Sequence, residues 1–240
     1  MKTTLACLLI LALSASAQDS LESPRWLSVT GWGYVETRPD QATVTFGVET
    51  TAYDPATAVE EAADAMEAAT RAAVRAGVDE DDIVTTYYSL WTEEEYDPVT
   101  YEYTGVMINH VTQSVAAEVR DLDEIGDVIA AVVSAGANNV SSVTFQVDDL
   151  QALKDEARSE AARDARRRAE QIAGALGLTL GEITSVSEYD YGYEDYYYDS
   201  GYSASTVSVY PAGGGEMAAP SITPDMLKIS ASVSVTFEIR

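Results

Sequence analysis

The chain has 240 residues, with 40 acidic and 14 basic side chains and a formal net charge of −26 at pH 7. Such a negative field repels nucleic acid and anionic lipid head groups, so nucleic acid is excluded as an expected partner. Cys7 is the single cysteine and is expected to be removed with the N-terminal signal described below, so the mature chain is expected to hold neither a disulfide nor a thiolate metal site. The charge favours basic partners and weak divalent-cation binding, although a solvated acidic surface is the simpler interpretation.

Residues 1–17 have the pattern of a secretory signal peptide. Lys2 supplies the charged start, residues 5–13 the apolar core, and Ala-Ser-Ala at 15–17 a small-residue cleavage site. A membrane-spanning helix needs about 20 apolar residues, so this run is too short to be one. We therefore expect cleavage after Ala17, a periplasmic or secreted mature chain without a transmembrane segment, and a flexible lead over residues 18–25. The alternative, a lipoprotein cysteine at Cys7, is disfavoured because too few residues precede it.

The next segment predicts two strands followed by a helix. Apolar and polar residues alternate over residues 26–35 and 42–48, and Gly31 marks a bulge or a close backbone approach in the first strand. The Asp-Pro pair at 54–55 predicts a helix start, and Gly77 predicts its end. Residues at helical spacing predict its buried stripe: Val59, Ala62, Met66, Ala69 and Ala73.

Two further strands are predicted over residues 83–91 and 101–120, joined by an acidic hairpin connection at 93–98. Residues 121–124 have the form of a capping box, with a cap residue followed by a glutamate three positions later. The helix that follows is expected to end at Gly136. Its expected buried residues are Leu122, Ile125, Ile129 and Val132.

A strand over residues 140–147 leads into the longest predicted helix. Asp148 or Asp149 is its expected cap and Gly177 its expected end. Its predicted stripe is Leu150, Leu153, Ala157, Ala161, Ala165, Ala169, Ile172 and Leu176. A strand begins at 183–186, and the last strand, over residues 227–239, shows the cleanest alternation of apolar and polar residues in the chain.

Four phrases of this sequence resemble the SIMPL domain family, once catalogued as a domain of unknown function. In chain order they are VTGWGYVETRPDQATVTFGVE, GVDEDDIVTTYYSLWTEEEY, GANNVSSVTFQVDD with the long helix that follows, and ITPDMLKISASVSVTFEI. The resemblance covers residues 26–240 as one domain. It implies an exported α+β fold with antiparallel sheet and packed helices, which we expect to form two intimately associated halves.

The resemblance also implies a kind of function. Members of the family include periplasmic immunogenic proteins that assemble into ring- or channel-like homo-oligomers, and others are linked to oxidative-stress tolerance. The family supplies no catalytic motif to transfer to this chain. The sequence departs from the family pattern in a tyrosine-rich acidic tract and in its very acidic surface.

No catalytic arrangement stands out in the sequence. His110 is the only histidine, and no GxSxG elbow accompanies it, so a structural role is the default. There is no EF-hand spacing, HExxH motif or phosphate-binding loop, so we predict no catalytic residue, cofactor or metal ligand.

The only basic cluster lies on the long helix. Arg163, Arg166 and Arg167 are the candidate self-association residues, accompanied by Arg158 and Arg168. The simpler interpretation is a solvated face whose arginines pair with neighbouring carboxylates, such as Asp164 with Arg168.

Residues 189–224 interrupt the succession of strands and helices. A loop of this length is either functional or disordered. Tyrosine offers apolar area with a polar tip, so this loop is a candidate binding surface. The candidate residues are Tyr189, Tyr191, Tyr193, Tyr196, Tyr197 and Tyr198.

These observations predict an exported, non-enzymatic envelope protein that acts as a homo-oligomer and has a link to stress tolerance. Two alternatives stay open. One is a carboxylate-based hydrolase with an unrecognised pocket, and the other is a monomeric binding module that uses the tyrosine-rich loop.

Overall fold

The computed structural model describes residues 25–189 and 219–240. The predicted signal peptide at 1–17, almost all of the lead at 18–25 and most of the tract at 189–224 lie outside these residues. The described chain forms two compact units. Unit 1 holds residues 25–33, 158–189 and 231–240, and unit 2 holds residues 34–157 and 219–230.

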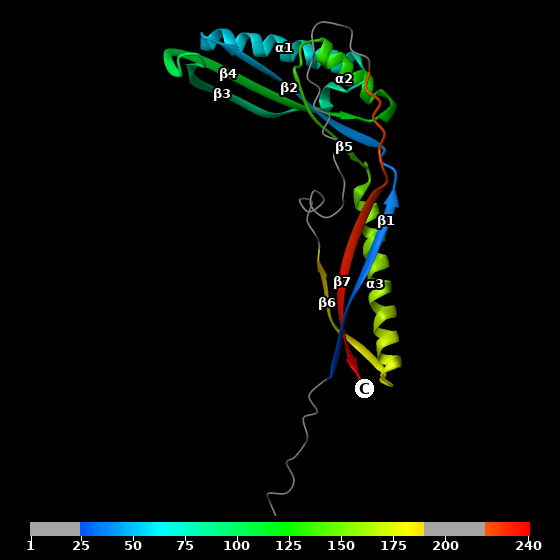
Figure 1. Cartoon of the computed structure of the whole chain (residues 1–240). Coiled ribbons are helices and arrows are strands. Elements are labelled where there is room, and N and C mark those ends of the chain that lie inside the picture. The colour runs from blue at the N-terminus through cyan, green and yellow to red at the C-terminus, as the bar shows by residue number, and fades with distance from the viewer. Residues whose placement is uncertain (1–24, 190–218) are drawn as a thin grey trace, which may run out of the picture. The chain divides into compact units, whose positions relative to one another are not determined.

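Unit 2 contains a four-stranded sheet with the strand order β3-β4-β2-β5 (Figure 1). The strands are β2 (Gln41–Ala52), β3 (Ile83–Asp97), β4 (Glu102–Val119) and β5 (Asn139–Gln146), and every neighbouring pair is antiparallel. Helices α1 (Pro55–Arg75) and α2 (Ile125–Ser134) cover one face. Alternate residues of β2, among them Val44 and Phe46, are fully buried beneath these helices.

Helix α1 begins as the sequence predicts. The Asp54 side chain accepts a hydrogen bond from the backbone N–H of Thr57, and Pro55 occupies the first turn. The predicted stripe is correct except at Val59, which is exposed; Ala58 is buried in its place. Gly77 follows the helix with φ +109°, a conformation that glycine adopts without strain.

The start of α2 differs from the predicted capping box. A short 3-10 turn, η2 (Leu122–Glu124), intervenes, and Asp121 accepts a hydrogen bond from the N–H of Asp123 rather than capping α2 itself. Glu124 precedes α2 without a side-chain capping bond. A similar turn, η1 (Glu80–Asp82), precedes β3.

The acidic hairpin connection predicted at 93–98 is also wrong. Strand β3 continues to Asp97, so that Asp97 pairs with Glu102 and Tyr96 with Tyr103. The turn itself spans residues 98–101. Asp97 holds it by accepting a hydrogen bond from the Val99 N–H at 2.7 Å. The acidic residues therefore belong to the strands and not to the loop.

Unit 1 contains a three-stranded sheet with the order β1-β7-β6. Its strands belong to β1 (Trp26–Thr37), β6 (Leu180–Tyr189) and β7 (Leu227–Ile239), and α3 (Leu150–Ala175) supplies its helix (Figure 1). The boundary between the units falls within β1, α3 and β7. The N–H of Ala152 donates to Asp149, which makes Asp149 the cap of α3.

The core of unit 1 joins α3 to the two longer strands. Its buried residues are Val29, Ala161, Ala165, Ala169, Val233, Val235 and Phe237. Two residues predicted for the buried stripe of α3, Ile172 and Leu176, are exposed, and Ala173 is buried instead. The α+β class with antiparallel sheets is confirmed.

Candidate functional site

The arginine face of α3 comprises the three predicted residues Arg163, Arg166 and Arg167, all exposed. They are neighbours on the helix surface because residues three or four positions apart lie side by side. Arg166 pairs with Glu170 one turn further on, with Nε 3.0 Å from Oε1. Arg167 instead pairs with Asp164.

Asp164 is a buried carboxylate that the sequence reasoning treated as a surface residue. Only 5% of it is exposed, and its Oδ2 accepts a hydrogen bond from the Trp32 backbone N–H at 3.0 Å. Arg168 approaches the same carboxylate at 2.7 Å, in addition to Arg167. The predicted pair between Asp164 and Arg168 is therefore present, and Arg167 contributes to neutralising a buried charge.

Gly31 explains how Trp32 reaches α3. A Cβ atom at position 31 would lie 2.1 Å from the carbonyl oxygen of Ala161 and 2.2 Å from the backbone nitrogen of Ala165. The backbones of β1 and α3 therefore meet without an intervening side chain. Of the two alternatives expected for this strand glycine, a bulge or a close backbone approach, the structure shows the close approach, which brings the Trp32 N–H within reach of Asp164.

The tyrosine-rich candidate loop is not placed by the structure. Tyr191, Tyr193, Tyr196, Tyr197 and Tyr198 lie outside the described residues, as does the side chain of Tyr189. Their role as a binding surface stays a prediction.

The sequence reasoning missed the β3–β4 hairpin as a candidate surface. Strand β3 lies at the edge of its sheet, and α1 contacts β2 and β4. The hairpin carries half of the exposed large hydrophobic side chains in the described residues. They are Val84, Tyr87, Tyr88, Leu90, Trp91, Tyr96, Val99, Tyr101, Tyr103, Val106 and Met107. A concentration of exposed apolar side chains is typical of interaction surfaces.

One face of the hairpin combines carboxylates with an aromatic stack. Alternate residues of β3 share a face, which places Trp91, Glu93, Glu95 and Asp97 together. Their cross-strand partners include His110 opposite Trp91 and Glu102 opposite Asp97, on either side of a register shift near Glu94. Glu95 joins them by accepting a hydrogen bond from the Thr104 hydroxyl at 3.1 Å. We call Glu93, Glu95, Asp97 and Glu102 the acidic face of the hairpin.

The stack fixes His110, the only histidine. Its ring lies on that of Trp91, with centroids 4.1 Å apart and planes 7° from parallel. Its Nε2 lies 3.0 Å from Oε1 of Glu93, but the atoms are not aligned for a hydrogen bond. This arrangement supports a structural role for His110.

Hydrogen bonds hold the acidic face in place. The bond from the Val99 N–H, followed by those from the Thr100 hydroxyl and N–H, lowers the pKa of the Asp97 carboxyl. Glu95 also accepts from the Tyr53 hydroxyl at 3.3 Å. The opposite face of the hairpin is mainly apolar, and its Tyr96 and Tyr103 rings meet edge to face with centroids 5.4 Å apart.

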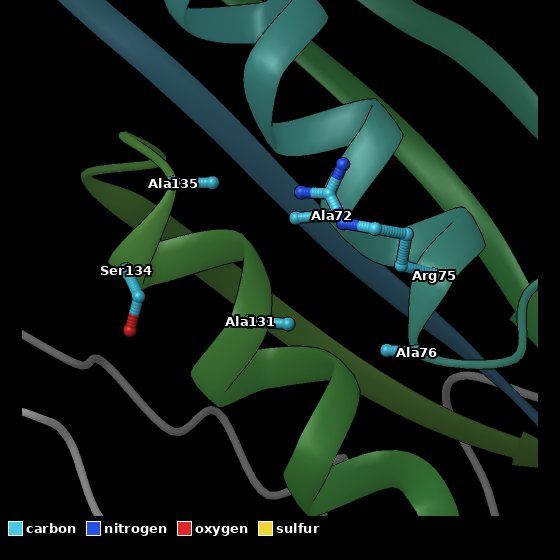
Figure 2. A pocket seen from close by; sticks show the side chains of 6 residues that line it. All are labelled: Ala72, Arg75, Ala76, Ala131, Ser134 and Ala135. Atoms are coloured by element: carbon cyan, nitrogen blue, oxygen red, sulfur yellow. The ribbon is translucent and has the colours of Figure 1, made fainter.

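A shallow groove lies between α1 and α2, and it is the place to look for the pocket that the hydrolase alternative requires. It encloses about 390 Å³ and is lined by Ala72, Arg75, Ala76, Ala131, Ser134 and Ala135. Figure 2 shows the Ser134 hydroxyl pointing away from the Arg75 guanidinium. No carboxylate lines the groove, so it does not offer the paired carboxyls that the hydrolase alternative requires.

Two negative observations apply to residues 25–189 and 219–240. No group of three or more histidine, aspartate or glutamate side chains there is arranged to hold a metal ion. No helix in the same residues combines the length and apolarity needed to cross a membrane.

Comparison with known proteins assigns the chain to a family. The sequence profile of SIMPL, described as a protein of unknown function (DUF541), matches residues 27–237. The chain belongs to the SIMPL family. The resemblance seen in the four sequence phrases is thereby confirmed.

Its relatives in the SIMPL family are similar over most of their length. An uncharacterized protein YggE of Edwardsiella ictaluri is 29% identical over 73% of this chain and 72% of its own. A 26 kDa periplasmic immunogenic protein of Brucella melitensis is 26% identical over 74% of this chain and 72% of its own. The uncharacterized YggE of Escherichia coli K12 is 26% identical over 74% of this chain and 70% of its own.

Proposed function

We propose that this SIMPL-family protein acts as a non-catalytic homo-oligomer in the periplasm. The observation that carries the proposal is the concentration of exposed apolar side chains on the β3–β4 hairpin. An isolated monomer would leave them all in water, whereas assembly through one face of the hairpin would bury those that lie on that face, Trp91 among them.

Charge supports an assembly formed by specific contacts. At a formal charge of −26, two copies repel each other over most of their surfaces. Residues 158–170 of α3 hold five arginines and three carboxylates, so this segment has a net positive charge. It would therefore attract the acidic surface of a second copy.

Sedimentation velocity of the mature protein over a wide concentration range tests the assembly. We expect discrete species larger than the monomer whose share increases with concentration. A protein that sediments as a monomer at every concentration, at both low and moderate salt, contradicts the proposed function.

The proposed periplasmic location is supported by the name of the Brucella relative, a periplasmic immunogenic protein, and by the signal-peptide pattern of residues 1–17. Mass spectrometry of the protein from a periplasmic extract is expected to give an N-terminus at Gln18. An uncleaved chain, or one lipidated at Cys7, contradicts it. A contribution to stress tolerance belongs to the same proposal, and survival of a deletion strain under peroxide tests it separately.

A further inference from the structure

The acidic face of the β3–β4 hairpin has the chemistry of an arginine-binding surface. Residues 83–107 contain five carboxylates and no basic side chain. Among the carboxylates, Glu93 and Glu102 are exposed and share a face with Trp91, 46% of which is exposed. Guanidinium groups pair with carboxylates through two parallel hydrogen bonds and stack on aromatic rings, so a surface offering both favours arginine over lysine.

Two carboxylates of the acidic face are held by hydrogen bonds before any partner binds. The Thr104 hydroxyl and the Tyr53 hydroxyl both donate to Glu95, and the Val99 N–H donates to Asp97. The Gly105 N–H donates to Glu94 at 2.9 Å on the opposite face. A surface fixed in this way loses less side-chain entropy on binding.

The arginine face of α3 offers the matching groups. The side chain of Arg166 is 71% exposed and that of Arg167 is 66% exposed, and Arg163 lies beside them on the same helix. Their pairing with Glu170 and Asp164 leaves guanidinium N–H groups able to reach a second carboxylate, because each arginine has five donors.

Charge distinguishes this arrangement from a contact between two hairpins. Two copies that met through the acidic faces of their hairpins would place four carboxylates beside four carboxylates. A hairpin that meets the arginine face of another copy places opposite charges together. Like charges across an interface oppose binding, so the second arrangement is favoured.

We propose that the acidic face of the hairpin docks on the arginine face of α3 in a second copy of this chain. This inference rests on the proposed homo-oligomer and names the two surfaces that form it. The contact is heterologous, because the two copies contribute different surfaces, and contacts of this type produce rings when the rotation closes.

Two charge-reversal variants test the contact. The hairpin variant carries Glu93→Lys and Glu102→Lys, which spares Glu95 and Asp97 and so keeps their hydrogen bonds. The helix variant carries Arg163→Glu and Arg166→Glu, which spares Arg167 beside the buried Asp164. Each variant alone brings like charges together, so we expect its dissociation constant in sedimentation to increase by about tenfold or more.

Mixing the two variants provides the decisive observation. Lysines on one hairpin then face glutamates on the other copy's helix, while the remaining pair of surfaces is native. We expect an equimolar mixture to assemble where each variant alone does not, and we expect a single chain carrying all four changes to recover assembly. A contact between two hairpins would instead leave the helix variant assembled like wild type.

Matched controls isolate charge from folding. Glu60→Lys with Asp64→Lys makes the same charge change on the exposed surface of α1 and is expected to leave the contact intact. Arg163→Lys with Arg166→Lys keeps the charge and is expected to weaken assembly only slightly. Far-UV circular dichroism checks that each variant folds. If the hairpin variant does not fold, Glu93→Gln with Glu102→Gln replaces it, and weaker assembly of this neutral pair is then the expected result.

The outcomes separate this inference from the proposed function. Wild-type protein that stays monomeric contradicts the homo-oligomer itself. The docking of hairpin on helix is contradicted if both folded variants form the same oligomers as wild type. It is also contradicted if the two folded variants fail to assemble when they are mixed. Neither result contradicts the homo-oligomer itself.

Discussion

At the residue scale, Asp164 connects the helix of unit 1 to its first strand. Its carboxylate accepts from the Trp32 N–H and pairs with Arg167 and Arg168. Removing a buried group with several partners costs more than removing a surface ion pair, because the partners lose their counter-charge and a donor loses its acceptor. The arginine face therefore includes one residue, Arg167, whose replacement would also affect folding.

We predict that Asp164→Ala lowers the free energy of unfolding by about 3 kcal/mol. The loss leaves the Trp32 N–H without an acceptor and two guanidinium groups without their shared carboxylate. Urea denaturation followed by circular dichroism measures it. Glu170→Ala is the control, because Glu170 is exposed and its ion pair with Arg166 lies on the helix surface; its expected effect is within about 0.5 kcal/mol. Equal effects of the two changes would contradict a buried role for Asp164.

Gly31 and Gly174 give a matched pair of glycine substitutions. We predict that Gly31→Ala destabilises the protein by about 3 kcal/mol or more, because the new methyl group would overlap the backbone of α3 at Ala161 and Ala165. Gly174 lies within α3 with nothing within 4 Å of its would-be Cβ. Gly174→Ala is therefore expected to stabilise the helix by about 0.5–1 kcal/mol. Thermal and urea unfolding measure the stability of both variants. A Gly31→Ala protein as stable as wild type would contradict the close approach of the two backbones.

At the element scale, alternation predicted strands well wherever one face is buried. Strand β7 has the predicted bounds, 227–239, because its apolar residues occupy every second position. Strand β3 runs six residues beyond its predicted end, since glutamate and aspartate are poor strand formers and were assigned to a loop. Pairing with β4, which sequence does not reveal, keeps those residues in the strand.

Helix α3 shows a second limit of sequence reasoning. The buried alanines continue at intervals of four to Ala173, whereas Ile172 and Leu176 were chosen because they are large and apolar, and both are exposed. The burial of Asp164 depends on Trp32, 132 positions earlier in the chain, so no local pattern predicts it. The sequence identified the arginines of α3 as candidate self-association residues, but it did not identify the surface of the β3–β4 hairpin.

We predict that the tip of the β3–β4 hairpin contributes to assembly and little to folding. Glu93 and Ile108 are cross-strand partners. Replacing residues 94–107 by Asn-Gly would connect them through a favoured two-residue turn. No residue in the removed segment is buried. We expect the free energy of unfolding to change by no more than about 1 kcal/mol, because surface segments of this kind rarely affect stability strongly. Sedimentation is expected to show a monomer. A cooperative loss of folding would indicate that the tip supports the core.

At the scale of the whole molecule, two electrostatic effects of opposite sign act on assembly. Every copy carries a formal charge of −26, or −27 if the expected cleavage after Ala17 removes Lys2, and the copies repel each other. The proposed contact between the acidic face of the hairpin and the arginine face would be attractive. The repulsion acts between charges that are farther apart than the paired charges of the contact. Low salt concentrations therefore weaken the repulsion first, and higher concentrations also weaken the attraction.

We predict that the dissociation constant of the wild-type assembly first decreases and then increases as salt is added. The Debye length is about 10 Å at 0.1 M and about 3 Å at 1 M, so moderate salt screens the repulsion between distant charges before it screens adjacent pairs. Sedimentation equilibrium over a potassium chloride series measures the curve. The helix variant, which lacks the attractive pairs, is expected to assemble better with salt throughout and to show no minimum. A wild-type dissociation constant that increases from the lowest salt onward would show that net repulsion is unimportant. A wild-type dissociation constant that decreases over the whole salt series would show that burial of apolar side chains of the hairpin, and not its carboxylates, stabilises the contact between copies.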